Sequence, residues 1–290
     1  MSINAGVESG VLYVVATPIG NLGDITERAR AVLAAVDVIA AEDTRHSGRL
    51  LQHLQITTPT IALHEHNERE RAPQLIERLQ QGASVALISD AGTPLVSDPG
   101  FHLVRLAREQ AIKVVPVPGA SAMLAALAAS GLPSDRFSFE GFLPAKSGAR
   151  KKCLEALADD NRTLIFYETP HRIVEALADM VSVFGEERYV VLARELTKTF
   201  ETIKGDAVGG LLQWVRNDAN QQKGEMVLLV KGAGESADGK HEQEGRRILK
   251  VLLEELPLSQ ASSLAAKISG SKKKSLYQYG LLLAGKDNEK

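Results

Sequence analysis

The sequence predicts two α/β domains, the first built on a parallel sheet and the second on a mixed sheet, followed by a small C-terminal helical domain. Three observations lead to this fold class. Short apolar runs alternate with helical periods through the first 118 residues, and a second series of apolar runs includes two that lie close together. A small-residue polar segment then precedes a leucine-rich tail. We therefore expect domains at 1–118 and 119–232, a linker at 233–240 and a helical domain at 241–290.

The first domain is expected to alternate strand and helix. Short apolar or β-branched runs predict strands, and apolar residues at helical spacing predict helices. The expected strands are 11–16, 38–41, 60–63, 84–89 and 113–117, and the expected helices are 25–36, 69–81 and 100–110. Asp24 or Thr26 would cap the first helix. Strict alternation implies right-handed crossovers and a parallel sheet covered on both faces.

The second domain is expected to open with an alanine-rich helix at 120–130, which Gly131 and Pro133 end. The strands that follow are expected at 136–140, 163–167, 189–193, 199–204 and 225–230, and the helices at 150–158, 171–184 and 206–214. Only residues 194–198 separate two of these strands, which predicts an antiparallel pair. The second sheet is therefore expected to be mixed.

The tail is expected to form three short helices. Five apolar residues at helical spacing mark the first, which Pro257 closes: Ile248, Leu249, Leu252, Leu253 and Leu256. Ser259 can cap a second helix and Gly270 can end it, while Ser271 can cap a third at 272–284. Three short helices with a glycine before the last resemble a helix-turn-helix.

Composition limits the class of protein. Of the 290 residues, 44% are hydrophobic and 24% are charged, which is typical of a soluble globular protein and excludes disordered and collagen-like chains. Cys153 is the single cysteine, so an internal disulfide is impossible and a reducing cytosol is favoured. No apolar stretch reaches the roughly 20 residues of a membrane helix, and the first residues do not resemble a signal peptide. We therefore expect a cytoplasmic protein with no membrane partner.

The net charge of -2 argues at first against a nucleic-acid partner. The charge is divided unequally, however, because residues 240–290 carry 10 Lys and Arg against 6 Asp and Glu. The body is therefore acidic and the tail is basic. An acidic body suits a cationic ligand, and a basic tail can contact RNA phosphates.

Four loops that follow predicted strands are the candidate ligand sites, because ligands of parallel α/β sheets bind at the carboxyl ends of strands. The loop at 16–24 could also be a tight turn, and the carboxylates at 41–46 could simply cap a helix. The loop at 89–100 is the strongest candidate, since its two Asp, two Pro and two Gly exceed what a turn requires. At 117–122, small residues permit close approach of a ligand to a helix N-terminus.

These loops resemble the tetrapyrrole methylase family of S-adenosylmethionine-dependent methyltransferases, and most closely its ribosomal branch, which methylates the 2'-hydroxyl of a cytidine in 16S rRNA. The resembling blocks span most of residues 11–232 in order, and they are YVVATPIGNLGDIT, AEDTRHS, HEHNE, SDAGTPLVSDPG, VPGASA, FEGFLPAK, FYETPHRI and AREL. The resemblance implies two α/β domains with the cofactor between them, a homodimer, and 16S rRNA or the small ribosomal subunit as partner.

The resemblance also implies a set of residues around S-adenosylmethionine. Carried over position by position, they are Ile19, Thr93, Val96, Ala120, Ser121, Tyr167, Ala193 and Met226. Small-molecule members of the family commonly have G-D-P where this chain has Gly92, Thr93 and Pro94. Because that departure removes an acid, we add Asp90 as a hypothetical source of negative charge near the cofactor.

Methyl transfer from a sulfonium depends chiefly on orientation, yet a ribose hydroxyl is a weak nucleophile that a base would assist. Asp43, Glu168 and His171 are the candidate bases. Arg45, Arg172 and Arg194 could hold phosphate, or could pair with the carboxylates instead. The candidate catalytic residues are thus Asp43, Arg45, Glu168 and His171, and the sequence does not choose among the bases.

Cations at the start of two predicted helices oppose the helix dipole, which favours a role in binding RNA. The candidate RNA-binding residues are Lys146, Arg150, Lys151, Lys152, Lys272, Lys273 and Lys274. His64 and His66 have no third ligand nearby, so we expect no metal site.

Two alternative functions stay open: a small-molecule methylase acting on a tetrapyrrole, and a non-catalytic RNA-binding assembly factor. Low aromatic content and the appended helical tail disfavour the first alternative.

Overall fold

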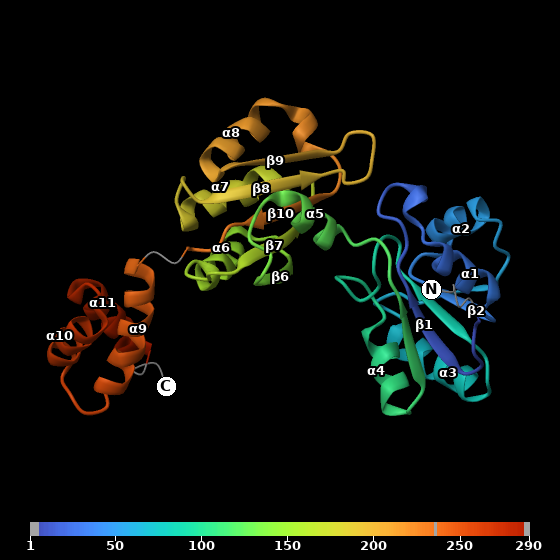
Figure 1. Ribbon diagram of the computed structural model, residues 1–290, viewed down its shortest axis with the longest axis horizontal. Helices are drawn as coiled ribbons and strands as arrows, with labels where there is room; N and C mark the ends of the chain where they lie inside the picture. Colours follow the sequence, from blue (N-terminus) through green and yellow to red (C-terminus); the bar gives the residue numbers. More distant parts are fainter. Residues whose placement is uncertain (1–5, 235–236, 287–290) are drawn as a thin grey trace. The chain divides into compact units, whose positions relative to one another are not determined.

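The computed structural model describes residues 6–234 and 237–286 and divides them into two compact units (Figure 1). The first unit ends at Lys231 and contains both sheets. The second begins at Gly232 and contains the three C-terminal helices together with Asp159–Asn161. The predicted boundary between residues 118 and 119 therefore falls inside the first compact unit.

The predicted elements are all present, with ends that differ by a few residues, whereas the helix at residues 44–53 was not predicted. The strands are β1 (Val11–Val15), β2 (Val38–Ala41), β3 (Thr60–Ala62), β4 (Val85–Ile88), β5 (Lys113–Val117), β6 (Phe137–Phe142), β7 (Thr163–Glu168), β8 (Tyr189–Arg194), β9 (Thr202–Ala207) and β10 (Met226–Val230). The helices are α1 (Glu27–Ala35), α2 (Thr44–His53), α3 (Glu68–Gln80), α4 (Phe101–Glu109), α5 (Ala122–Ser130), α6 (Ser147–Leu157), α7 (Ile173–Phe184), α8 (Val208–Asn217), α9 (Ala237–Leu252), α10 (Leu258–Ser269) and α11 (Lys273–Lys286), with short 3-10 turns η1 (Leu22–Asp24) and η2 (Ala219–Gln222).

The first sheet is parallel throughout, as predicted, with the strand order β3-β2-β4-β1-β5. Its central strands β2 and β4 are buried at every position. One apolar cluster joins one face of the sheet to α1 and α2, and another joins the opposite face to α3 and α4. Thr26 caps α1, because its side chain accepts a hydrogen bond from the Ala29 amide. Coverage of both faces leaves the loops at the strand ends as the places where a ligand can bind.

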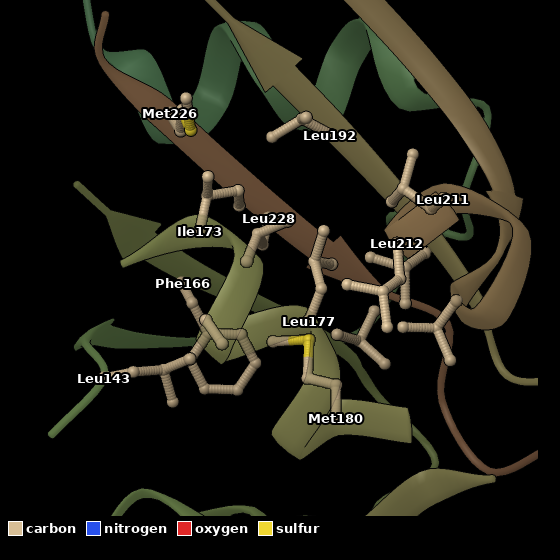
Figure 2. Packing of buried hydrophobic residues seen from close by; sticks show 14 of the residues in the cluster. Leu143, Phe166, Ile173, Leu177, Met180, Leu192, Leu211, Leu212, Met226 and Leu228 are labelled. Carbon is tan, nitrogen blue, oxygen red and sulfur yellow. The ribbon is translucent and has the colours of Figure 1, made fainter. Parts of the chain in front are cut away.

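The second sheet is mixed, as predicted, with the order β6-β7-β10-β8-β9. β6 and β7 are parallel, whereas the other neighbouring pairs, including the predicted β8–β9 pair, are antiparallel. Figure 2 shows the core on one face, where Phe166, Leu177 and Leu228 pack together. Helix α5 packs against the other face through Ala126 and Leu127. The start of α5 lies beside the candidate site described below.

Two strand ends differ from the prediction for identifiable reasons. Strand β6 continues past Glu140 through a bulge, where Gly141 takes a left-handed conformation with φ 70°. Strand β9 starts at Thr202 rather than residue 199, because the connection after β8, in which Glu195 and Thr197 have positive φ values, continues as turns up to Glu201, whose amide donates to the Lys198 carbonyl. A period-two pattern in the sequence does not report either local conformation.

In the second unit, α9, α10 and α11 share a small apolar core that includes Leu249, Ala261 and Leu276. Gly270 ends α10 in a left-handed conformation, as predicted. The prediction that Ser259 caps α10 is wrong, since the helix already begins at Leu258 after Pro257. Among the described residues, no helix is long and apolar enough to cross a membrane.

Candidate active site

A cavity of about 230 Å³ in the first unit is lined by loops that follow strands of both sheets. The first loop contributes Ile19, and the loop after β4 contributes residues 91–93 and 96–98. The remaining wall comes from the second half of the unit and consists of Ser121, Ala122, Phe142, Tyr167, Glu168, Thr169, Pro170, Ala193, Leu196, Glu225, Met226 and Val227. We call this cavity the apolar pocket, because most of its lining side chains are apolar.

Backbone pairing fixes two of the predicted loops to each other. The Thr17 amide donates to the Gly92 carbonyl at 2.8 Å, and the Gly92 amide donates back to Thr17 at 3.0 Å. Gly92 has φ 83°, a conformation that favours glycine. Leu95 and Ser97 also take positive φ values, which is uncommon for residues with side chains. The loop is thus held in an unusual conformation at the wall of the pocket, as is common at functional sites.

The N-terminal end of α5 forms another part of the wall. Ser121 occupies the N-cap position of α5, but its side chain makes no capping hydrogen bond. Ser121 lines the pocket. The Thr93 hydroxyl donates to the Ala120 carbonyl at 3.1 Å, and the Met123 amide donates to the Tyr167 hydroxyl at 3.3 Å. These bonds connect the loop after β4, α5 and β7 around the same space.

Asp98 is the acidic residue through which the loop after β4 lines the pocket. Its pKa is raised to about 6, chiefly because the carboxyl is buried; the charges of Glu42 and Asp90 add to this shift, and a hydrogen bond with Ser89 opposes it. Burial likewise raises the pKa of Glu42. Three carboxylates near the ends of β2 and β4 thus create a negative potential at this side of the pocket.

Glu168 is the most deeply buried acid of the pocket. Its Oε1 accepts hydrogen bonds from the Thr169 amide at 2.7 Å and from Arg172 Nε at 2.9 Å, and Arg172 Nη2 lies 2.8 Å away. Its Oε2 is buried and has no hydrogen-bond partner among the described residues. A buried acceptor without a donor is costly, so a ligand that donated a hydrogen bond to this oxygen would be favoured.

The structure brings seven of the nine predicted cofactor residues to the wall of one pocket: Ile19, Thr93, Val96, Ser121, Tyr167, Ala193 and Met226. Ala120 lies just behind the wall, where its carbonyl accepts from Thr93. Asp90 faces a second cavity, described below, and its Oδ1 accepts from the Asp43 amide. Asp98, rather than Asp90, is the acid of this loop that lines the apolar pocket. Its own motif, Ser97-Asp98-Pro99-Gly100 in the same loop, could have pointed to it.

Three of the four predicted catalytic residues lie outside the lining of the apolar pocket. Asp43 caps α2 and pairs with the exposed Arg45 at 3.0 Å, which is the structural alternative that the sequence left open. The Arg45 hydrogen bonds lower the pKa of Asp43 to about 2. The His171 ring lies 3.3 Å from the Thr169 hydroxyl and is exposed. Glu168 is the candidate base that lines the pocket.

Two predicted phosphate-binding arginines are buried, so their assignment is corrected. Arg150 is fully buried, with Nε 2.7 Å from Asp179 and further hydrogen bonds to the carbonyls of Pro144 and Ala145. The guanidinium of Arg194 donates to Phe200, Lys223, Gln221 and Thr202, and so closes the loops after β8. Neither guanidinium is available to RNA. Nothing in the sequence of the basic run at 150–152 indicated that Arg150 is buried.

The predicted lysines differ from Arg150 in exposure. Lys146 and Lys152 are exposed at the start of α6, whereas Lys151 is half-buried and lies 3.6 Å from Asp179. Lys272, Lys273 and Lys274 are exposed at the start of α11. Within residues 6–234 and 237–286, no group of three or more His, Cys, Asp or Glu is placed to hold a metal ion.

Comparison with known proteins identifies the family. The model of the Tetrapyrrole (Corrin/Porphyrin) Methylases matches residues 11–210, and that of the RsmI C-terminal HTH domain matches residues 240–284. "Ribosomal RNA small subunit methyltransferase I" of Haemophilus influenzae is 58% identical over 94% of this chain and 97% of its own. Its counterpart in Pseudomonas aeruginosa is 59% identical over 97% of this chain and 100% of its own.

Solved structures show the same fold at low sequence identity. Uroporphyrin-III-C-methyltransferase from Thermus thermophilus matches with a TM-score of 0.55 and 21% identity, over 77% of this chain and 95% of that one. The methyltransferase CobJ matches with a TM-score of 0.58 and 22% identity, over 78% and 95%. The chain therefore belongs to the tetrapyrrole methylase family, in the branch whose curated members are named ribosomal RNA small subunit methyltransferase I.

Proposed function

We propose that the protein transfers a methyl group from S-adenosylmethionine to the 2'-hydroxyl of a cytidine ribose in 16S rRNA of the small ribosomal subunit. Family membership makes the chain a methyltransferase, and its curated relatives are named for small-subunit rRNA. The single observation that carries the proposal is the apolar pocket, whose charged lining residues are all acidic: Glu168 and Glu225, which pair with Arg172 and Lys198, and Asp98, for which no ion pair is found among the described residues. A cavity with acidic groups and apolar walls suits a cationic ligand that carries an aromatic base.

The residues of the pocket fit S-adenosylmethionine. When bound, this cofactor supplies a methyl group on a positively charged sulfur. Ile19, Val96 and Met226 would contact its apolar parts, and Ser121 at the uncapped start of α5 would accept or donate hydrogen bonds. Asp98 would face its positive charge. These residues would orient the methyl group toward the acceptor, and orientation supplies much of the acceleration in such reactions.

Glu168 would act on the acceptor hydroxyl. Because Arg172 and the Thr169 amide already engage Oε1, the carboxylate is held in a fixed orientation with Oε2 left to accept a hydrogen bond. An acceptor hydroxyl bound to Oε2 would be oriented by it, and would lose its proton to it as the new oxygen–carbon bond forms and the bond between the methyl group and the cofactor's sulfur breaks. We infer that Glu168 is the base.

The C-terminal unit would contribute to RNA binding. The three exposed lysines at the start of α11 place positive charge where the helix dipole disfavours it. Contacts between these lysines and RNA phosphates would offset that unfavourable interaction.

The homodimer implied by the family resemblance and the cytoplasmic location stay predictions.

Methyl incorporation tests the proposed function. Small subunits from a strain that lacks this enzyme, incubated with the full-length protein and labelled S-adenosylmethionine, should gain label on a cytidine 2'-oxygen of 16S rRNA. Absence of label there would overturn the proposal. Labelling of a tetrapyrrole instead would favour the small-molecule methylase. A protein that binds subunits but shows no calorimetric binding of S-adenosylmethionine would be an assembly factor.

Asp98 should make cofactor affinity depend on pH. Because the raised pKa of Asp98 is about 6, its carboxylate is charged above pH 6 and protonated below it. Affinity for the cationic cofactor should therefore rise about threefold to tenfold between pH 5 and pH 7, as expected for one charge near a partly buried cation. Calorimetric titration across this range measures the effect.

The Asp98→Asn variant is the control for this prediction. It should bind the cofactor with an affinity that is nearly constant between pH 5 and pH 7 and close to that of the native protein at pH 5. Melting curves at each pH would verify that both proteins remain folded. An unchanged pH dependence in Asp98→Asn would show that another group is responsible.

A further inference from the structure

A second cavity of about 280 Å³ lies beside the apolar pocket in the first unit. Ile19, Ala91 and Glu225 line both cavities, so the two share a wall. Most of the remaining lining comes from the first loop and from one face of α2. We call this second cavity the α2 pocket.

The two pockets differ in charge. Within the described residues, the lining of the apolar pocket contains no Lys, Arg or His, whereas His46, Arg49 and Lys198 line the α2 pocket. Lys198 is neutralised by ion pairs with Glu195 and Glu225, each at 2.9 Å. Arg49 is exposed on α2 and makes no ion pair among the described residues. The Asp90 carboxylate also lines the α2 pocket, where its Oδ1 accepts a hydrogen bond from the Asp43 amide. A cationic cofactor therefore favours the apolar pocket, and an anionic group favours the part of the α2 pocket beside Arg49.

Ser47 gives a second, independent indication of a ligand. Ser47 lines the α2 pocket, is 3% exposed, and has a buried Oγ with no hydrogen-bond partner among the described residues. A hydroxyl buried without a partner is unfavourable in the free protein, and a ligand that donates or accepts a hydrogen bond there would remove that cost. Leu22, which is 44% exposed, adds an apolar surface to the same cavity.

We propose that the α2 pocket binds one ribose–phosphate unit of the substrate RNA, with Arg49 and His46 contacting its phosphate and Ser47 Oγ its sugar or phosphate oxygens. This inference rests on the proposed function, since it names the site where the same reaction holds its acceptor strand. A guanidinium matches the geometry of two phosphate oxygens. The shared wall at Ile19 and Ala91 brings a ribose in the α2 pocket next to a cofactor in the apolar pocket.

Two variants of the full-length protein test the site. Arg49→Gln should weaken binding to small subunits about tenfold and make the slope of log affinity against log salt shallower by about 0.7, as for the loss of one single-strand phosphate contact. Ser47→Ala should weaken binding about threefold to tenfold while its melting temperature stays equal or rises, because the unpaired hydroxyl is gone. In both variants KM for subunits should rise, with kcat and calorimetric affinity for S-adenosylmethionine unchanged.

Arg105→Gln is the matched control, because Arg105 is an exposed arginine on α4 that lines neither pocket. It should retain native affinity for subunits. Native affinity and KM in both Arg49→Gln and Ser47→Ala would overturn the inference, as would a loss of cofactor affinity with subunit binding intact. If binding to subunits depends on Arg49 but the native protein transfers no methyl group, the proposed function is wrong, whereas the inference that the α2 pocket binds RNA is supported.

Discussion

Glu168→Gln should lower kcat for methyl transfer by about 10²-fold to 10⁴-fold, the range expected for loss of a positioned base. The substitution keeps the size of the side chain, but the amide oxygen that replaces the carboxylate cannot take up a proton as effectively. Affinity for S-adenosylmethionine should change little, because the proposed role of Oε2 is toward the acceptor. Single-turnover rates with saturating subunits would measure the effect on the chemical step.

Asp43→Asn is the comparison for this experiment. Asp43 is also a predicted catalytic carboxylate, but it caps α2 and lies outside the lining of the apolar pocket, and asparagine caps helices equally well. Its kcat should stay within a few-fold of the native value. Since Glu168→Gln weakens the pair with Arg172, melting curves must show that the variant is folded. A kcat in Glu168→Gln no lower than in Asp43→Asn would contradict the assignment of Glu168 as the base.

Arg150→Met should lower the free energy of unfolding by about 3–5 kcal/mol, as is typical when one partner of a buried ion pair is removed. The Asp179 carboxylate, 7% exposed, would lose its closest cationic partner, and two backbone carbonyls would lose a donor. The midpoint of urea unfolding of the full-length protein measures the change.

Two further variants separate a structural role of Arg150 from RNA binding. Lys152→Met removes an exposed cation two residues away, and its stability should stay within about 0.5 kcal/mol of the native value. Arg150→Met combined with Asp179→Leu should be less destabilised than Arg150→Met alone, because no unpaired carboxylate remains. Native stability with reduced RNA affinity in Arg150→Met would instead support the prediction that this arginine binds RNA.

The predicted fold was accurate where local pattern decides it. The alternation of apolar runs and helical periods predicted a parallel first sheet, and the short segment after β8 predicted an antiparallel partner for that strand. Element ends were less accurate, because a bulge at Gly141 or a left-handed residue such as Thr197 leaves little trace in hydrophobic periodicity. Ser259 was a plausible cap by residue type, yet Pro257 starts the helix earlier.

For the candidate site, the loop could be predicted from the sequence, but the acid that lines the pocket could not. The loop at 89–100 stood out in sequence because it is long and rich in Asp, Pro and Gly, and the structure places it at the wall of the apolar pocket. Which of its two acids faces that pocket depends on the backbone conformation between them, where Leu95 and Ser97 have positive φ. The departure from G-D-P at Gly92, Thr93 and Pro94 favoured Asp90, whereas Asp98 lines the pocket.

The order of most elements, the loops that carry the candidate site residues and the family resemblance can be predicted from the amino-acid sequence, because each depends on residues that are neighbours along the chain. Which charged groups are paired and which remain available to a ligand depends on the fold. Arg150 meets Asp179 across 29 positions, and the raised pKa of Asp98 depends partly on Glu42. Burial and pairing are set by partners distant in sequence, so no local pattern could show that Glu168 keeps one oxygen free or that Ser47 lacks a partner.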